Sequence, residues 1–390
     1  MTSPKAIYDV IVIGAGIEGS SCAYNLLKSG KKVLLLEQFP LPHTRGSSHG
    51  QSRITRFAYT NDFYVRMMVD AFPMWDTLEK ESGVDFFLNC GVLDLRGTKS
   101  SANKVTSALS AYDIPHELLN AQEMRKRFPV MTVADTDLAV YDPSGGILRA
   151  DWALAAFQKV FKQLGGILHD NEAVLTVKPG SPAKVVTSRS VYAASNVVIT
   201  AGPWTGRFTS ALGLRLPLEP VRVLPMYWTV KPGQEEGHHW SNFPCFIDTR
   251  GEQVGAFHCY GLPCLEYPGL FKVANHNGAP TDPDHRDRLS DDDSWIEEHV
   301  VNTVKSTFPG LEPKPAIKEV CMYANTPDSH PIIDRHPKYQ NIFIAAGFSG
   351  HGFKLAPAVG KMVTELVTGS DLTYNMEPFR IGRFDTSSKL

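Results

Sequence analysis

The sequence predicts an α/β fold built on a parallel β-sheet, and three apolar stretches carry that prediction. Residues 10–13 and 33–36 are short runs of aliphatic residues, which are typical of strands buried on both faces of a parallel sheet. A helical pattern from about residue 17 to 28 joins them, and Gly30 is its expected C-terminal cap. A third run, residues 197–201, ends at Gly202 and fits a return to the same sheet. Strands that alternate with helices in this way predict an α/β domain.

The turn between the first strand and the first helix matches G-x-G-x-x-G. Gly14 is expected to form the tight turn, Gly16 to let the backbone approach a pyrophosphate, and Gly19 to let the helix pack on the strand. Glu37 ends the second strand, about twenty residues further on, where an acid can accept hydrogen bonds from a ribose. The helix N-terminus supplies free N–H groups and a positive dipole. Together these features favour a dinucleotide site over an ordinary glycine turn.

A basic loop follows this unit, over residues 43–56. It carries three arginines and two histidines among small residues. The simplest interpretation is a solvated basic loop. However, cations and small residues directly after a nucleotide-binding unit also suit a backbone that closes over phosphates and an anionic substrate. We favour the second interpretation.

A second glycine-rich turn lies near the C-terminus. Residues 341–347 predict a strand, residues 347–354 form the turn, and residues 355–368 predict a helix. This turn would point another helix N-terminus at an electron-rich group, such as a reduced flavin ring.

The remaining pattern predicts two insertions into the nucleotide-binding domain. Residues 1–85, 146–217 and 317–390 are assigned to the nucleotide-binding domain, and residues 86–145 and 218–316 to a substrate domain. Further helices are expected at residues 63–81, 152–164 and about 291–308, and further strands at residues 86–88, 91–95, 221–230, 256–262 and 270–276.

The composition excludes several classes of partner. The 390 residues carry a formal net charge of -2, which does not suggest a nucleic-acid or anionic-membrane partner. No stretch reaches the ~18 apolar residues of a membrane span, and no signal peptide is expected. Among the six cysteines, Cys259 and Cys264 beside His258 could suggest a metal site. Scattered thiols in a reducing compartment, with no metal, are the better explanation.

Ser388, Lys389 and Leu390 end the chain and match the address that a peroxisomal import receptor reads. We therefore expect a peroxisomal protein.

Four motifs together resemble one known family. These are the Gly14 to Gly19 turn with Glu37, the HGQSRITR stretch at 49–56, the Cys321-Met322-Tyr323 and TPD stretches, and GFSGHGFK at 347–354. They are similar to the monomeric sarcosine oxidase family, and within it to the peroxisomal sarcosine and L-pipecolate oxidases. The resemblance runs from about residue 7 to 383.

This resemblance implies a D-amino-acid-oxidase-like flavoprotein, with a Rossmann-type FAD-binding domain and a substrate domain built on a mixed β-sheet. It implies one FAD per chain, joined to Cys321 through a thioether, and a monomer. It implies that Arg56 and Lys354 bind the substrate carboxylate and that Lys272 lies near flavin N5 and helps to activate oxygen. The residues implied to line the substrate cavity are His49, Tyr260, His276 and Tyr323. Ser52, where bacterial members carry threonine, would lie near the flavin. The other residues expected to bind FAD are Gly14, Ala15, Gly16, Ile17, Gly19, Glu37, Gln38, Arg45, Ser47, Ser48, Arg53, Val174, Ala201, Gly202, Trp204, Gly347, Phe348, Gly350, Gly352 and Lys354.

The expected reaction is oxidation of a secondary amino acid, such as sarcosine, L-pipecolate or L-proline, to the imine, with O2 reduced to H2O2. The flavin does the redox chemistry while the protein positions the substrate. Two alternatives remain: an FAD-dependent dehydrogenase of N-methyl amino acids that passes electrons to a carrier protein, and a non-catalytic FAD-containing binding protein. Peroxide release separates them.

Overall fold

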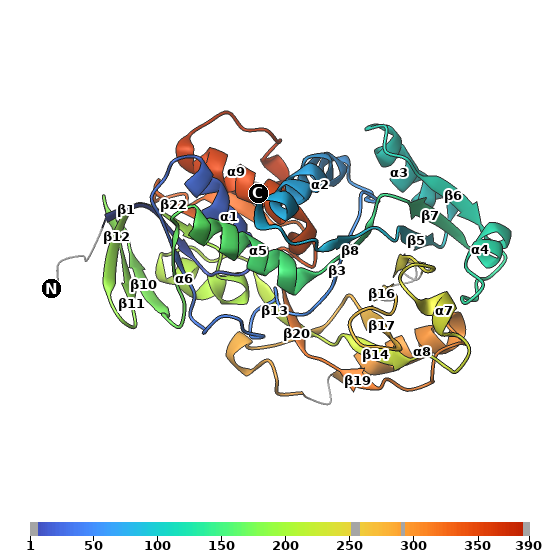
Figure 1. The fold of residues 1–390 in the computed structure, drawn as a ribbon. Helices are drawn as coiled ribbons and strands as arrows, with labels where there is room; N and C mark the ends of the chain where they lie inside the picture. The colour runs from blue at the N-terminus through green and yellow to red at the C-terminus, as the bar shows by residue number, and fades with distance from the viewer. Residues whose placement is uncertain (1–6, 251–257, 290–292, 385–390) are drawn as a thin grey trace, which may run out of the picture.

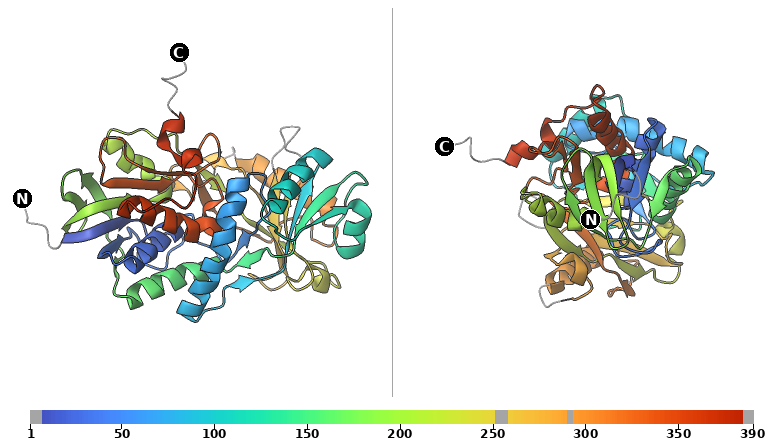
Figure 2. Two further views of the ribbon diagram at one scale, coloured as in Figure 1. Left: turned by 90° about the horizontal axis from the view of Figure 1, so that it is seen from above. Right: turned by 90° about the vertical axis from the view of Figure 1, so that its left-hand side faces the viewer.

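The computed structural model describes residues 7–250, 258–289 and 293–384. The molecule is elongated (Figures 1 and 2). One end holds the sheet that contains β1 and β12, and the other end holds β5, β6, β7 and the helices α3 and α4.

The first sheet has eight strands and is parallel at its centre. Strands β9, β2, β1, β12 and β22 run in the same direction, while β11 and β21 run in the opposite direction. Strand β10 pairs with β11 in a hairpin at the edge beyond β12. The bounds of these strands are β1 (Ile7–Ile13), β2 (Val33–Leu36), β9 (Ile167–His169), β10 (Val174–Lys178), β11 (Ala183–Thr187), β12 (Val191–Ile199), β21 (Ile332–Arg335) and β22 (Ile342–Ala346). Because β1, β2, β12 and β22 are parallel, the loops after them lie together at one edge of the sheet.

Helices α1, α2, α5 and α9 pack together against this sheet, with α1 and α9 in the most extensive contact. Their bounds are α1 (Ile17–Lys28), α2 (Asp62–Ser82), α5 (Ala150–Gln163) and α9 (Gly352–Thr368). Helix α9 begins at Gly352, inside the second glycine-rich turn and before the predicted start at Leu355. The turn is therefore shorter, and its last glycine belongs to the first turn of the helix.

The second sheet also has eight strands and is mixed. Its order is β19-β14-β17-β16-β15-β5-β7-β6, with β15 and β5 parallel and the other pairs antiparallel. The bounds are β5 (Val92–Arg96), β6 (Glu117–Asn120), β7 (Leu138–Asp142), β14 (Met226–Thr229), β15 (Cys245–Asp248), β16 (Cys259–Leu262), β17 (Leu270–Asn275) and β19 (Ile317–Lys318). The helices of this region are α3 (Lys99–Ser110), α4 (Ala121–Arg127), α7 (Glu235–His238) and α8 (Ser294–Thr307). The domain boundaries given above, at residues 85/86, 145/146, 217/218 and 316/317, stay a prediction.

The prediction of one strand over residues 221–230 is wrong. The chain forms β13 (Glu219–Val223) and β14, which belong to different sheets. Pro225 lies between them and has no backbone N–H for a sheet ladder, so the strand ends there. Strand β13 pairs with β20 (Cys321–Asn325), which places Cys321 opposite Val223.

Two small three-stranded sheets complete the fold. The first contains β3, β8 and β4, and the second contains β18, β13 and β20. The bounds not yet given are β3 (Arg53–Thr55), β4 (Phe87–Leu88), β8 (Gly146–Leu148), β18 (Ala279–Pro280) and α6 (Thr205–Ala211). The start of the predicted strand at residue 256 and the acids at 291 and 292 lie outside the described residues.

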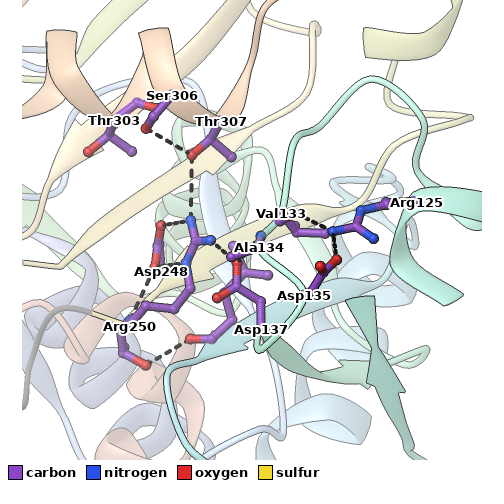
Figure 3. A network of polar contacts seen from close by, with 12 residues as sticks. Arg125, Val133, Ala134, Asp135, Asp137, Asp248, Arg250, Thr303, Ser306 and Thr307 are labelled. Carbon is purple, nitrogen blue, oxygen red and sulfur yellow. Dashed lines mark hydrogen bonds and ion pairs between the residues drawn. The ribbon is translucent and has the colours of Figure 1, made fainter. Parts of the chain in front are cut away.

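Arg250 joins three parts of the second sheet region (Figure 3). Its guanidinium pairs with Asp137, which precedes β7, and with Asp248 at the end of β15 at 2.6 Å. It also lies 3.4 Å from the hydroxyl of Thr307, at the end of α8. The residues of this network lie far apart in the sequence but close together in space. Their contacts hold α8 against the end of the sheet.

Among residues 7–250, 258–289 and 293–384, no helix is long and apolar enough to cross a membrane. The same residues contain no cluster of three metal-binding side chains. Cys259 and Cys264 are buried and form no disulfide in the described part of the chain.

Candidate active site

A cavity of about 1010 Å³ lies where the loops after β1, β2, β12 and β22 meet. Many residues that the sequence assigned to the cofactor line it: Gly14, Ala15, Gly16, Ile17, Glu37, Gln38, Ser47, Ser48, Arg53, Val174, Ala201, Gly202, Trp204, Gly347, Phe348, Gly350 and Gly352. His49 and Tyr323 line it as well. The position matches the rule that ligands of open α/β sheets bind at the carboxyl ends of the strands.

The glycine motif is packed so closely that a residue with a side chain does not fit at Gly14 or Gly19. Gly14 has a φ of +99°, and a Cβ there would lie 2.6 Å from the carbonyl oxygen of Thr200. A Cβ on Gly19 would lie 1.8 Å from the carbonyl oxygen of Gly14, so Gly19 serves helix packing and does not line the cavity. Gly16 leaves the backbone open toward the cavity beside Ser48. This cradle fits the diphosphate of a dinucleotide.

Backbone N–H groups hold the carboxylate of Glu37 beside the glycine motif. Its Oε2 accepts a hydrogen bond from the N–H of Ala15 at 2.9 Å, and its Oε1 accepts one from the N–H of Phe39 at 3.1 Å. The side chain is buried and still faces the cavity. Each carboxylate oxygen has a second lone pair, so Glu37 can also accept ribose hydroxyls.

Residues of the basic loop line the cavity beside the glycine motif. The Ser48 hydroxyl accepts a hydrogen bond from the N–H of Ile17 at 2.9 Å, whereas the buried hydroxyl of Ser47 has no partner among the described residues. Arg53 donates to the carbonyl oxygens of Ser47 and Ser52, the latter at 2.7 Å, and thereby holds the loop. Arg45 does not line the cavity, but its guanidinium pairs with Asp287, which does. The unpartnered serine hydroxyl and the glycine cradle fit an FAD.

Cys321 is buried beside this loop and does not line the cavity. Its Sγ lies 3.9 Å from the carbonyl oxygen of Ser47, which is a lining residue. Its neighbours in the sequence, Val320 and Tyr323, do line the cavity. The thiol is therefore one residue layer away from the space in which a flavin fits.

Arg56 and Lys354 lie over the same aromatic ring. The guanidinium carbon of Arg56 is 4.5 Å from the ring centre of Tyr59, and Nζ of Lys354 is 5.9 Å from it. Lys354 also donates to the carbonyl oxygen of Gly350 at 3.4 Å. Asp94 lies 3.5 Å from Arg56 but is shared with Arg96, so it compensates only part of the positive charge. Burial, together with Arg56 and Arg53, lowers the pKa of Lys354 to about 7.

Aromatic rings and imidazoles join this cationic pair to the cavity. The His276 ring lies 5.3 Å from that of Tyr323 and 6.4 Å from that of His351. Burial, with His258, Lys354 and Arg56 nearby, holds the pKa of His276 well below its usual range. Burial is also the main reason why the pKa of Tyr260 is raised well above its usual value, with Tyr323 as its nearest partner. These groups are therefore neutral at pH 7.

His49 is also neutral at pH 7. Burial lowers its pKa to about 4, although a hydrogen bond to the carbonyl oxygen of Gly46 opposes the shift. Arg286 lies 3.5 Å from His49 Nδ1 and lines the cavity too.

Lys272 is a buried residue of the second sheet. It lies in the middle of β17 and is only 5% exposed. Its Nζ lies 2.8 Å from Glu266 Oε1 and 3.3 Å from the hydroxyl of Ser52. Lys272 is therefore half of a buried ion pair.

Sequence reasoning missed four residues of this site: Tyr59, His351, Glu266 and Arg286. Tyr59 lies three residues from Arg56, and His351 lies between Gly350 and Gly352, so proximity to predicted site residues was the available signal. Glu266 and Arg286 carry no such signal, because the contacts of Glu266 with Ser52 and of Arg286 with His49 span more than 200 residues.

Comparison with known proteins shows the family to which this chain belongs. Residues 9–366 match the model of the family described as FAD dependent oxidoreductase. The chain is 45% identical over 392 residues to peroxisomal sarcosine oxidase of Mus musculus, with 100% of this chain and 99% of the relative covered. It is 31% identical to monomeric sarcosine oxidase of Bacillus sp. strain NS-129, with 96% and 97% covered. The chain belongs to the sarcosine oxidase family of FAD-dependent oxidoreductases.

This chain shares its fold with solved structures of amino acid oxidases. The structure of NikD, an unusual amino acid oxidase essential for nikkomycin biosynthesis, superimposes with a TM-score of 0.81 at 20% identity, covering 97% of this chain and 98% of NikD. Glycine oxidase from Geobacillus kaustophilus superimposes with a TM-score of 0.78 at 20% identity, covering 97% and 99%. The predicted D-amino-acid-oxidase-like fold is therefore confirmed, and the protein is an FAD-dependent oxidase that acts on the CH–NH group of amino acids.

Proposed function

We propose that the protein oxidises a secondary amino acid, either N-methylated or cyclic, to its imine and reduces O2 to H2O2. Sarcosine, L-pipecolate and L-proline are the substrates of this class. The observation that carries the proposal is the pair of cations, Arg56 and Lys354, over the ring of Tyr59. Lys354 is buried and Arg56 is partly buried, and with one partly shared counter-ion the two cations favour a substrate carboxylate between them.

The neutral side chains around that pair define the rest of the substrate. His276, Tyr323 and Tyr260 are uncharged at pH 7, so they can pack against an apolar ring or methyl group and offer hydrogen bonds without adding charge. With the carboxylate fixed, the C–N bond of the amino acid is oriented toward the cofactor. A bound flavin supplies the two-electron chemistry, and the residues named here supply position.

We propose further that FAD, one per chain, is attached to Cys321 through a thioether. The thiol lies 3.9 Å from the carbonyl oxygen of Ser47, a residue that lines the cavity, and this supports the proposal. Gly14, Gly16, Glu37, Ser47 and Ser48 would hold the nucleotide part. Gly347, Phe348 and Gly350 would lie beside the flavin, and Lys272 would lie near its N5.

We also propose that the protein is a monomer in the peroxisome, carried there by an import receptor that reads Ser388, Lys389 and Leu390. Those residues lie outside the described part of the chain. The printed names of two relatives, peroxisomal sarcosine oxidase of Mus musculus and of Homo sapiens, support the location.

A panel of amino acids, read by peroxide release from the purified flavoprotein, tests the function. We expect release with sarcosine, L-pipecolate or L-proline and none with their amides, which lack the carboxylate. Bleaching of the flavin without peroxide in air would indicate a dehydrogenase. No bleaching with any member of the panel would favour a binding protein.

A further inference from the structure

Lys272 lies at one end of a buried chain of polar side chains. Its ammonium group contacts Glu266 Oε1 at 2.8 Å, and both side chains are almost fully buried, with 6% and 5% exposed. The hydroxyl of Tyr227, on the neighbouring strand β14, donates to Glu266 Oε2 at 2.8 Å. Because the two charges of the ion pair cancel at a distance, the field of Lys272 in the cavity is weak while Glu266 is ionised.

The chain of polar side chains continues from Tyr227 to the cavity. The Tyr227 hydroxyl also lies 3.2 Å from Glu319 Oε2, and the Tyr267 hydroxyl donates to Glu319 Oε1 at 2.7 Å. Glu319 and Tyr267 line the cavity, whereas Tyr227 is 1% exposed and Lys272 is 5% exposed. The chain thus leads from a surface that a solvent proton can reach to a lysine that it cannot reach directly.

The number of protons that these polar side chains share determines which way a proton can move between them. Tyr227 has one hydroxyl proton but two carboxylate neighbours, so only one of the two contacts can be a hydrogen bond while both acids are ionised. When a proton arrives on Glu319, that acid can donate to the Tyr227 oxygen, and the proton of Tyr227 can pass to Glu266. Glu266 is then neutral, and the charge of Lys272 is no longer compensated.

We infer that Glu266 is a positioning residue for Lys272 and accepts a proton that Glu319 and Tyr227 deliver from the cavity. This inference rests on the proposed oxidase function. Reduction of oxygen follows O2 + 2 e⁻ + 2 H⁺ → H2O2. A bound, reduced anionic flavin would supply both electrons and one proton. The second proton comes from Lys272, which regains it from Glu266.

The other charged groups near Glu266 do not change this assignment. Arg53, from β3, and Asp151, from α5, both act on Glu266 through space. Burial raises the pKa of Glu266, but Lys272 and the hydroxyls of Ser52 and Tyr227 outweigh burial, so the pKa lies below its usual value. Glu266 is thus ionised before the proton arrives.

The test uses flavin that dithionite has reduced, so that no amino acid is needed, and follows reoxidation in oxygenated buffer by stopped-flow absorbance. Tyr227→Phe keeps the ring that lies 5.3 Å from Lys272 Nζ but removes the hydroxyl between the acids. We expect reoxidation to slow about a hundredfold, as for loss of a general acid, with a larger solvent isotope effect. Tyr374→Phe is the matched control, because its buried hydroxyl also donates to a carboxylate, Asp70, but lies outside this chain.

A second variant separates the effect of the Lys272 charge from the effect of proton transfer through Tyr227. Glu266→Gln leaves Lys272 uncompensated at every pH, so the Kd of sulfite, an anion that adds to oxidised flavin, should fall at least about tenfold. Tyr227→Phe should leave the sulfite Kd unchanged. In the Glu266→Gln background, Tyr227→Phe should cause no further loss of reoxidation rate, since the two residues act in series.

Tyr227→Phe with the reoxidation rate of Tyr374→Phe would overturn the relay, and an unchanged sulfite Kd in Glu266→Gln would overturn the charge argument. Slow reoxidation of the wild-type flavin would instead refute the proposed oxidase function itself. That outcome can be distinguished from the other two, because it does not depend on any variant.

Discussion

The guanidinium carbon of Arg56 lies 4.5 Å from the centre of the Tyr59 ring. The electron-rich face of an aromatic ring attracts a cation, more strongly where water is excluded. The same ring lies 5.9 Å from Nζ of Lys354, so one tyrosine supports two cations that repel each other. This arrangement is costly without an anion between the cations, which is why we assign the substrate carboxylate to it.

Removal of either cation should weaken carboxylate binding and leave the flavin in place. A charge-assisted hydrogen bond is worth about 1.5–3 kcal/mol, so Arg56→Met and Lys354→Met should each raise the Kd of a carboxylate inhibitor about ten- to a hundredfold. Titration of the flavin spectrum measures this Kd. Lys361→Met is the control, because Lys361 lies on the same helix but pairs with Asp70. Equal affinities in all four proteins would contradict the assignment.

Carboxylate binding should also depend on pH near neutrality. The pKa of Lys354 is lowered to about 7 by burial and by Arg56 and Arg53, so the ammonium group is charged below pH 7 and neutral above it. Affinity for a simple carboxylate should therefore be constant at low pH and fall by up to about tenfold per unit above pH 7. A series of titrations at different pH values measures this fall. The fall should disappear in Lys354→Met, and its persistence there would assign it to another group.

Cys321 should carry the flavin covalently. Mass spectrometry of the denatured protein should find flavin on the peptide that contains Cys321. In Cys321→Ser, acid should release all of the flavin, while Cys264→Ser, which changes another buried thiol, should retain it. Complete release of flavin from the wild-type protein by acid would refute the attachment.

Lys272 should accelerate the reaction with oxygen more than the oxidation of the substrate. Once Glu266 is protonated and the charge of Lys272 is uncompensated, that charge about 4 Å away, at an effective dielectric near 20, is worth about 4 kcal/mol to a developing superoxide. Lys272→Met should therefore reoxidise roughly two to three decades more slowly and be reduced by substrate within about tenfold of wild type. Stopped-flow absorbance measures flavin reduction by substrate and flavin reoxidation by oxygen separately.

The control for this variant is the double change Lys272→Met with Glu266→Gln. It removes both members of the ion pair and leaves no unpaired buried carboxylate, which would by itself be destabilising. Equal losses in both half-reactions would mean that Lys272 positions the substrate or the flavin.

The last three residues should act as an import signal and not as part of the fold. A fluorescent protein that ends in Ser388, Lys389 and Leu390 should become punctate in cells with peroxisomes. The protein without these residues should stay in the cytosol with its flavin and activity intact. Peroxisomal import of the truncated protein would point to another signal.

The sequence by itself determined the nucleotide half of the site, because that half is local. Gly14 and Glu37 end two strands that pair in parallel register, Ile13 opposite Leu36, so one βαβ unit brings them together. The turn at Gly347 follows a strand that joins the same sheet through β12. Hydrophobic pattern and glycine spacing are sufficient to predict such units.

Only the tertiary structure decided the polar half. The break at Pro225 sends β13 to the strand of Cys321 and β14 to the strand of Lys272, and the apolar run 221–230 does not reveal that division. Glu266 reaches Ser52, and Tyr227 reaches Glu319, across separations of 214 and 92 residues. Sequence pattern reports which face of a strand is buried, but the partner of a buried charge depends on which strands lie side by side. Lys272 therefore appeared in the sequence as a lone cation, and the pairing of β14 with β17 placed it within a buried ion pair.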